Sequence, residues 1–216
     1  ELVDALERGE LHLPLTPERD LLARTSGWLE GDASPLLLQG DRLGWRRWLQ
    51  AMEQVVAELV ERAHAPLPEP VEAADPELSD RLNAEQCAAV RALDQASVVL
   101  LSGGPGTGKT STVVEILARA EARHPGLRIG LAAPTGKAAR RLGEAVMAQR
   151  TPLPCSTLHR WLEAGSRGFG RHRQRPLELD LLVIDEMSML DLALTEALLE
   201  ALPSGCRLLL VGDPAQ

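Results

Sequence analysis

Lysine is scarce in this chain of 216 residues, in which Lys109 and Lys137 are the two lysines among 23 basic side chains. No apolar run reaches membrane-spanning length, and the N-terminus lacks the basic-then-apolar pattern of a secretory signal. The three cysteines, Cys87, Cys155 and Cys206, are far apart and lack metal-ligand spacing. These absences argue against a membrane span, a disulfide framework and a cysteine metal site. They predict a cytoplasmic protein with reduced thiols and no membrane partner.

The net charge of −8 argues at first against a nucleic-acid partner, but the charge is unevenly distributed. Residues 1–82 hold 17 acidic and 8 basic side chains, whereas residues 83–216 hold 14 acidic and 15 basic ones. The acidic excess therefore belongs to the first part of the chain. The overall sign says little about what the second part binds.

A glycine-rich segment at residues 97–112, SVVLLSGGPGTGKTST, carries the most specific signal. An apolar run precedes the spacing G-x-x-x-x-G-K-[ST], which ends in Lys109 and Thr110. Glycines let the backbone turn tightly and approach a phosphate, and the loop N–H groups attract its charge. We predict that this loop binds ATP, with Lys109 at the β- and γ-phosphates and the Thr110 hydroxyl on Mg²⁺. The predicted nucleotide-binding residues here are Gly103, Gly104, Pro105, Gly106, Thr107, Gly108, Lys109, Thr110 and Ser111.

Other polar residues lie near strand-like runs, where they suit ATP chemistry. Asp185 and Glu186 end the run LLVI; Asp185 is expected in the Mg²⁺ shell and Glu186 as the general base for the attacking water. Gln216, at the end of LLLVGDPAQ, is predicted to sense the γ-phosphate, and Gln86, in LNAEQ, to recognise adenine. Taken singly, each also fits a strand end or helix surface exposed to solvent.

Two short segments offer further polar groups. APTGKAA places Thr135 and Lys137 directly after a strand-like run, and STLH supplies a hydroxyl and an imidazole. A third segment, residues 165–176, holds four arginines, one histidine and the only phenylalanine. It is interpreted as a solvated flexible loop or, alternatively, as a loop that touches nucleic-acid phosphates.

Apolar runs and helical patterns alternate from residue 82 onward, which predicts an α/β fold with a parallel sheet flanked by helices. The expected strands are 98–101, 129–132, 181–184 and 208–211, and the expected helices are about 83–95, 110–123, 136–149 and 192–202. Residues 1–65 are predicted to form a small, mostly helical domain with short strands at 35–39 and 42–45 and a helix at about 46–64. Residues 66–81 are predicted to be an acidic, proline-rich linker.

The ordered set of motifs resembles that of the superfamily I DNA helicases. The motifs are LNAEQ, GGPGTGKT, APTGKAARRL, STLHRWL, LLVIDEMSMLD and LLLVGDPAQ. Within this class, the segment is similar to the RecD family, the α subunits of exodeoxyribonuclease V (the RecBCD complex). The resemblance is strong over 82–216 and weaker over PLLLQGDRLGWRRW, ahead of the motor.

The resemblance implies a RecA-like motor domain that hydrolyses ATP and moves 5′ to 3′ on single-stranded DNA. It implies that Pro134, Thr135, Thr157 and His159 contact the DNA strand, and Lys137 is grouped with them. It also implies RecB- and RecC-type partners and a docking role for the N-terminal domain. A second motor domain is expected beyond 82–216, because such motors need its arginines, so we expect a longer parent protein.

Three other functions stay open on the residues alone. The motor is also compatible with a free-standing RecD-like or relaxase-type helicase. A nucleotide-switch P-loop module would bind ATP without moving on DNA. A small-molecule kinase shares the phosphate loop, but APTGKAA and STLH argue against it, since a kinase has no use for strand-contacting loops.

Overall fold

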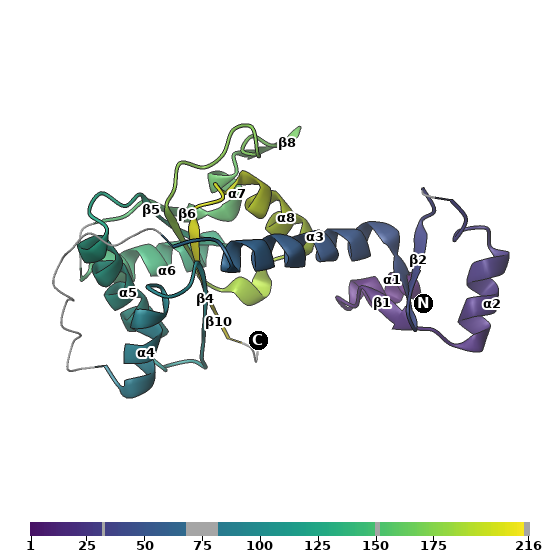
Figure 1. Ribbon diagram of the computed structural model, residues 1–216, viewed down its shortest axis with the longest axis horizontal. Coiled ribbons are helices and arrows are strands. Elements are labelled where there is room, and N and C mark those ends of the chain that lie inside the picture. The colour runs from purple at the N-terminus through teal and green to yellow at the C-terminus, as the bar shows by residue number, and fades with distance from the viewer. Residues whose placement is uncertain (32, 68–81, 150–151, 214–216) are drawn as a thin grey trace. The chain divides into compact units, whose positions relative to one another are not determined.

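The computed structural model describes residues 1–31, 33–67, 82–149 and 152–213 of the chain. The chain divides into two compact units, Glu1–Ala57 and Glu58–Gln216, and the division falls inside helix α3 (Arg46–Ala63) (Figure 1). Most of the predicted linker 66–81 lies outside the described residues. The domain limits 1–65, 66–81 and 82–216 therefore stay predictions.

The first unit combines helices with a small antiparallel sheet of order β1-β3-β2. Its elements before α3 are α1 (Leu2–Glu7), β1 (His12–Pro14), α2 (Pro17–Thr25), β2 (Leu36–Gln39) and β3 (Arg42–Trp45). Helices predominate, as expected, and β2 and β3 confirm the two expected strands. Strand β1 lies where only short helices were expected, because three residues are too few to show a period of two.

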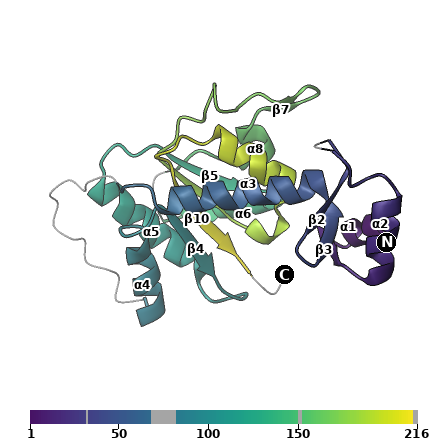
Figure 2. The ribbon, with the colours of Figure 1, turned by 45° about the vertical axis from the view of Figure 1, so that its right-hand side comes forward.

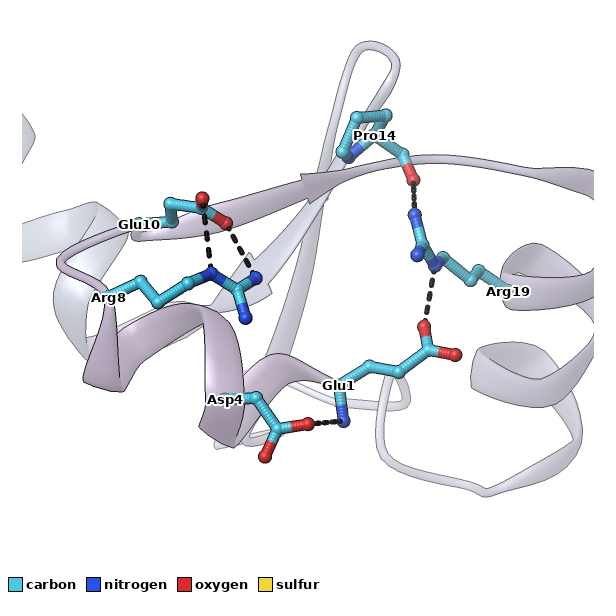
Figure 3. Close-up of polar contacts among 6 residues, drawn as sticks. All are labelled: Glu1, Asp4, Arg8, Glu10, Pro14 and Arg19. Atoms are coloured by element: carbon cyan, nitrogen blue, oxygen red, sulfur yellow. Dashed lines mark hydrogen bonds and ion pairs between the residues drawn. The ribbon is translucent and has the colours of Figure 1, made fainter.

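Local contacts account for these elements. The Thr16 hydroxyl caps α2 by accepting a hydrogen bond from the Arg19 N–H at 3.3 Å. The Arg19 guanidinium donates to the Glu1 carboxylate at 2.8 Å and to the Pro14 carbonyl at 2.9 Å (Figure 3). This arginine therefore ties α2 to β1. Trp45 packs against the buried core of the unit.

The second unit is built on a parallel sheet of order β4-β10-β9-β5-β6. Its strands are β4 (Val98–Ser102), β5 (Ile129–Ala133), β6 (Cys155–Thr157), β9 (Leu181–Ile184) and β10 (Arg207–Gly212). All four predicted strands are confirmed, because continuous apolar runs mark strands that are buried on both faces. Strand β6 was missed, since its sequence, Cys-Ser-Thr, is short and polar.

Helices cover the sheet, as Figures 1 and 2 show. They are α4 (Ala84–Ala92), α5 (Lys109–Arg123), α6 (Gly136–Met147), α7 (Leu158–Trp161), α8 (Leu192–Ala201) and the 3-10 turn η1 (Met187–Met189). Residues of α4, α5 and α6 share one buried core with alternate residues of the strands. A hairpin, β7 (Ala164–Gly165) and β8 (Gly168–Phe169), follows α7. In the ranges described here, no helix is long and apolar enough to span a bilayer.

Candidate functional site

The carboxyl ends of β4, β10 and β9 lie next to one another and bring two predicted motifs together. Ser102 at the end of β4 pairs with Gly212 of β10, and Ile184 at the end of β9 pairs with Leu210. Neighbouring strands are about 4.8 Å apart, so the glycine-rich loop and the acidic pair begin about 10 Å from each other. Ligands of parallel sheets bind at this edge.

The glycine-rich loop requires glycine at specific positions. Gly106 and Gly108 have φ angles of 77° and 81°, in the left-handed region that favours glycine. A Cβ atom on Gly103 would lie 2.7 Å from the Thr107 hydroxyl oxygen. Gly108 is also the N-cap of α5, so the loop delivers the positive end of that helix to the carboxyl edge of the sheet.

The Lys109 ammonium group is held over this loop. Its Nζ donates to the carbonyl of Gly103 and, at 2.9 Å, to that of Gly104. The side chain is half-buried, so the charge lies inside the curve of the loop rather than in open solvent. This is the position from which it can reach a phosphate that the loop encloses.

Gln86 connects helix α4 to the same loop. Its Oε1 accepts from the Asn83 N–H at 3.0 Å, and Asn83 Oδ1 accepts from the Gln86 N–H at 2.8 Å, which forms a capping box. Its Nε2 donates to the Thr107 carbonyl at 3.2 Å. Asn83 therefore starts α4 as predicted, and the glutamine side chain has a bracing contact that its sequence position did not reveal. Its adenine contact stays a prediction.

The residues predicted for Mg²⁺ have the oxygens that this ion prefers. The Thr110 hydroxyl is exposed in the first turn of α5. Asp185 Oδ1 accepts from the Glu186 N–H at 2.9 Å, whereas Oδ2 has no hydrogen-bond partner among the described residues. A hydroxyl and a carboxylate oxygen at one sheet edge fit a magnesium ion that keeps several waters. No group of three or more His, Cys, Asp or Glu side chains with metal-site geometry occurs in the part of the chain that is described.

Glu186 has an unusual backbone conformation that no sequence pattern predicted. Its φ and ψ are 57° and 42°, in the left-handed region, although it is not a glycine. This conformation costs roughly 1–2 kcal/mol, and such residues cluster at functional sites. It starts the turn η1, which packs against β10.

The candidate DNA residues follow the two adjacent strands β5 and β6 at the same sheet edge. Pro134 comes directly after β5, and the Thr135 hydroxyl caps α6 by accepting from Ala138 N–H at 3.2 Å. The Thr157 hydroxyl at the end of β6 caps α7 by accepting from Arg160 N–H at 3.3 Å. Both predicted threonines therefore have a structural task. Lys137 and His159 are exposed on the helices that follow.

The arginine-rich segment 165–176 is partly cross-linked by ion pairs. Glu163 lies 2.8 Å from Arg171 and 2.6 Å from Arg175. The hydrogen bond from Arg171 holds the pKa of the Glu163 carboxyl below its ordinary value, and that from Arg175 acts in the same direction. Most of the segment is exposed to solvent, as the first interpretation expected, and part of it forms the hairpin β7–β8, which was not predicted.

Gln216, the predicted γ-phosphate sensor, lies outside the described residues. The end of β10 nevertheless touches the nucleotide loop, because the Gly103 N–H donates to the Gly212 carbonyl at 3.3 Å. Gly212 was not among the predicted site residues. Its signal, a glycine at the end of a buried strand, was present in LLLVGDPAQ.

A family model described as an AAA domain matches residues 86–216 of this chain. The chain belongs to this AAA-domain family. The match covers every predicted site residue, from Gln86 to Gln216, and so places the whole candidate site within the AAA domain.

Curated proteins similar to this chain have RecD or RecD2 names. The RecBCD enzyme subunit RecD of Mycolicibacterium smegmatis is 40% identical over 96% of this chain and 42% of its own length. The ATP-dependent RecD2 DNA helicase of Deinococcus radiodurans is 47% identical over 62% of this chain and 18% of its own length. The RecBCD enzyme subunit RecD of Haemophilus influenzae is 36% identical over 65% of this chain and 25% of its own length.

Within the AAA domains, these relatives group the chain with the RecD helicase family, as the motifs predicted. The chain spans less than half the length of these relatives. The parallel α/β sheet flanked by helices agrees with the RecA-like fold that was expected.

Proposed function

We propose that this chain provides the first ATPase motor domain of a RecD-type DNA helicase. The motor hydrolyses ATP with Mg²⁺, moves 5′ to 3′ on DNA and works with RecB- and RecC-type subunits in the cytoplasm during double-strand-break repair and recombination. One observation carries the proposal. Nucleotide motifs follow β4 and β9, and candidate DNA-contacting loops follow β5 and β6 of the same sheet edge.

The nucleotide half of the site supports ATP hydrolysis. The loop N–H groups and the start of α5 hold the phosphates, and Lys109 moves from the Gly103 and Gly104 carbonyls to the β- and γ-phosphates. Thr110 and Asp185 hold Mg²⁺, which supplies charge neutralisation on the phosphate oxygens. Glu186 accepts the proton of the attacking water.

The DNA half lies beside it on the sheet. Strands β9 and β5 are hydrogen-bonded neighbours, so the acidic pair and the loop of Pro134 and Thr135 begin one strand spacing apart. Lys137 and His159 provide exposed donors for DNA phosphates on the adjoining helices. This adjacency supports a motor in which hydrolysis and DNA contact are coupled.

The extent of the sequence match favours a RecBCD-type subunit over a free-standing helicase. The mycolicibacterial RecD aligns with 96% of this chain, including the first unit, whereas the deinococcal RecD2 aligns with 62%. We propose that Glu1–Ala57 docks onto a partner subunit. Co-purification of the full-length protein with RecB- and RecC-type subunits of its own organism tests this. Failure to associate would favour the free-standing alternative.

The deciding experiment is ATP hydrolysis by the full-length protein with and without single-stranded DNA. Strong stimulation that Lys109→Ala abolishes supports the motor. The second candidate, a nucleotide switch, is favoured if hydrolysis is indifferent to DNA. Unwinding of duplexes with a 5′ or a 3′ overhang then tests the polarity, and unwinding from a 3′ overhang would contradict the proposal.

A further inference from the structure

The carboxyl end of β10 touches both halves of the nucleotide site, and Gly212 makes both contacts. On one side, its carbonyl oxygen accepts a 3.3 Å hydrogen bond from the N–H of Gly103, which is the first residue of the phosphate loop. On the other side, the Met187 side chain lies over its Cα atom. Gly212 is buried, whereas Gly103 and Met187 are half-buried.

The Met187 contact leaves no room for a side chain on Gly212. A Cβ atom placed there would lie 2.6 Å from Met187 Cγ, 3.5 Å from its sulfur and 3.8 Å from its Cβ. The nearest of these atoms belongs to the stem of the methionine, not to its flexible end. Relief therefore needs a χ1 rotation or a backbone shift at Met187.

Met187 in turn is joined by one peptide bond to Glu186, whose left-handed backbone has a φ of 57°. The turn that follows is closed by hydrogen bonds from Met189 N–H to the Glu186 carbonyl at 3.1 Å and from Leu190 N–H to the Met187 carbonyl at 3.1 Å. A strained residue persists only while its surroundings determine its conformation. The space beside Gly212 that the Met187 side chain occupies is part of those surroundings.

We propose that Gly212 is a positioning residue for the water-activating carboxylate. By lacking a Cβ atom, it leaves room for the Met187 side chain at the end of β10, so that the adjacent Glu186 is not displaced from the angle that hydrolysis needs. The inference rests on the proposed function, because it assigns Glu186 the role of general base. It adds a steric coupling between β10, Met187 and Glu186 that acts without contact with the nucleotide.

The test uses the full-length protein and compares Gly212→Ala, Met187→Ala and the double variant. Gly212→Ala is expected to lower kcat for ATP by ~10²-fold, as an ångström-scale misplacement does, and to change KM for ATP by less than about threefold. Met187→Ala alone is expected to stay within about tenfold of the wild-type kcat. The double variant is expected to recover most of the kcat lost in Gly212→Ala, because the clashing Cγ atom is gone.

Several outcomes overturn the proposal. One is an unchanged kcat in Gly212→Ala; another is a double variant that is folded but as slow as Gly212→Ala. Circular dichroism and thermal unfolding establish that each variant is folded. If Gly212→Ala does not fold alone, Gly212→Ser in the Met187→Ala background provides the same comparison.

Rates of ATP hydrolysis are measured with and without DNA. Wild-type hydrolysis that ignores DNA counts against the proposed motor, while the basal-rate ratios still decide the role of Gly212.

Discussion

The side-chain amide of Gln86 donates a 3.2 Å hydrogen bond to the backbone carbonyl of Thr107, which fastens the start of α4 to the phosphate loop. The same side chain closes the capping box of α4 through its Oε1 atom. The glutamine therefore shapes the loop before any base is bound. Gln86 therefore has two roles to distinguish: the structural hydrogen bond to the loop and the predicted contact with adenine. One substitution can test both.

Replacement Gln86→Ala is expected to weaken binding of both ATP and GTP, by about tenfold, because a hydrogen bond to the loop is lost. If Gln86 also contacts adenine, as predicted, the loss of affinity is larger for ATP than for GTP. Fluorescent nucleotide titrations measure both affinities. Equal losses of ATP and GTP affinity would contradict the adenine contact but support a structural role for the Gln86–Thr107 hydrogen bond. Unchanged affinities would contradict that structural role.

The two lysines of the chain form a natural pair of variants. Lys109→Ala is expected to reduce hydrolysis by ~10²-fold or more, because a charge aimed at the phosphates is removed. Lys137→Ala is the matched control, since Lys137 is exposed on α6. It should leave basal hydrolysis unchanged and weaken DNA stimulation. A lower rate of ATP hydrolysis without DNA in Lys137→Ala would contradict this division of roles.

Glu186→Gln is expected to keep nucleotide affinity and lower kcat by roughly 10²–10⁴-fold, since the amide cannot accept the proton of the attacking water. Single-turnover hydrolysis beside equilibrium nucleotide binding separates the two quantities. Glu196→Gln, on α8 and away from the carboxyl ends of the strands, serves as the control. A variant at position 186 that hydrolyses ATP at the wild-type rate would remove Glu186 from the chemistry.

Burial raises the pKa of the Cys206 thiol from 9.0 to about 12. The folded thiol keeps its proton where the unfolded thiol loses it, so this group's stabilising effect is complete below pH 9. The effect is lost progressively as the pH rises from about 9 toward 12. Alkylation at pH 8, followed by mass spectrometry, should label half-buried Cys87 well before Cys206. Equal labelling rates in the native protein would contradict the buried position.

Arg62 is expected to stabilise the second unit. Its guanidinium donates to the Pro203 carbonyl at 2.7 Å and to the Leu199 and Leu202 carbonyls at 3.0 Å, at the end of α8. Arg62→Ala leaves these acceptors without their donor and should cost about 3 kcal/mol of unfolding free energy. Arg128→Ala, which removes an exposed ion pair, should cost less than about 1 kcal/mol. Equal urea midpoints would contradict this.

The sequence predicted most of the sheet because β9 and its neighbours are uninterrupted apolar runs. It missed β6, whose three polar residues pair only through β5, and the hairpin β7–β8. The phosphate loop was predictable because its glycines and lysine have fixed spacing. The left-handed Glu186 was not, because that conformation depends on packing rather than residue type.

Contacts between distant residues escaped prediction for the same reason. The pairing of Arg171 and Arg175 with Glu163 depends on how the hairpin folds back, which charge counts do not reveal. The link between Gly212 and Gly103 joins segments more than a hundred residues apart. The motif order indicated which residues carry the chemistry, and the three-dimensional structure shows how they brace one another.

The strand order has a consequence for biosynthesis. Strand β10 is the last of the five in sequence, yet it lies between β4 and β9. During translation β4 has no partner in the sheet until residues 207–212 have left the ribosome, although β5, β6 and β9 can already pair. Such long-range pairing is slow and leaves strand edges open. The nascent chain thus passes through a stage with an exposed β4 edge, which is where chaperone protection is most useful.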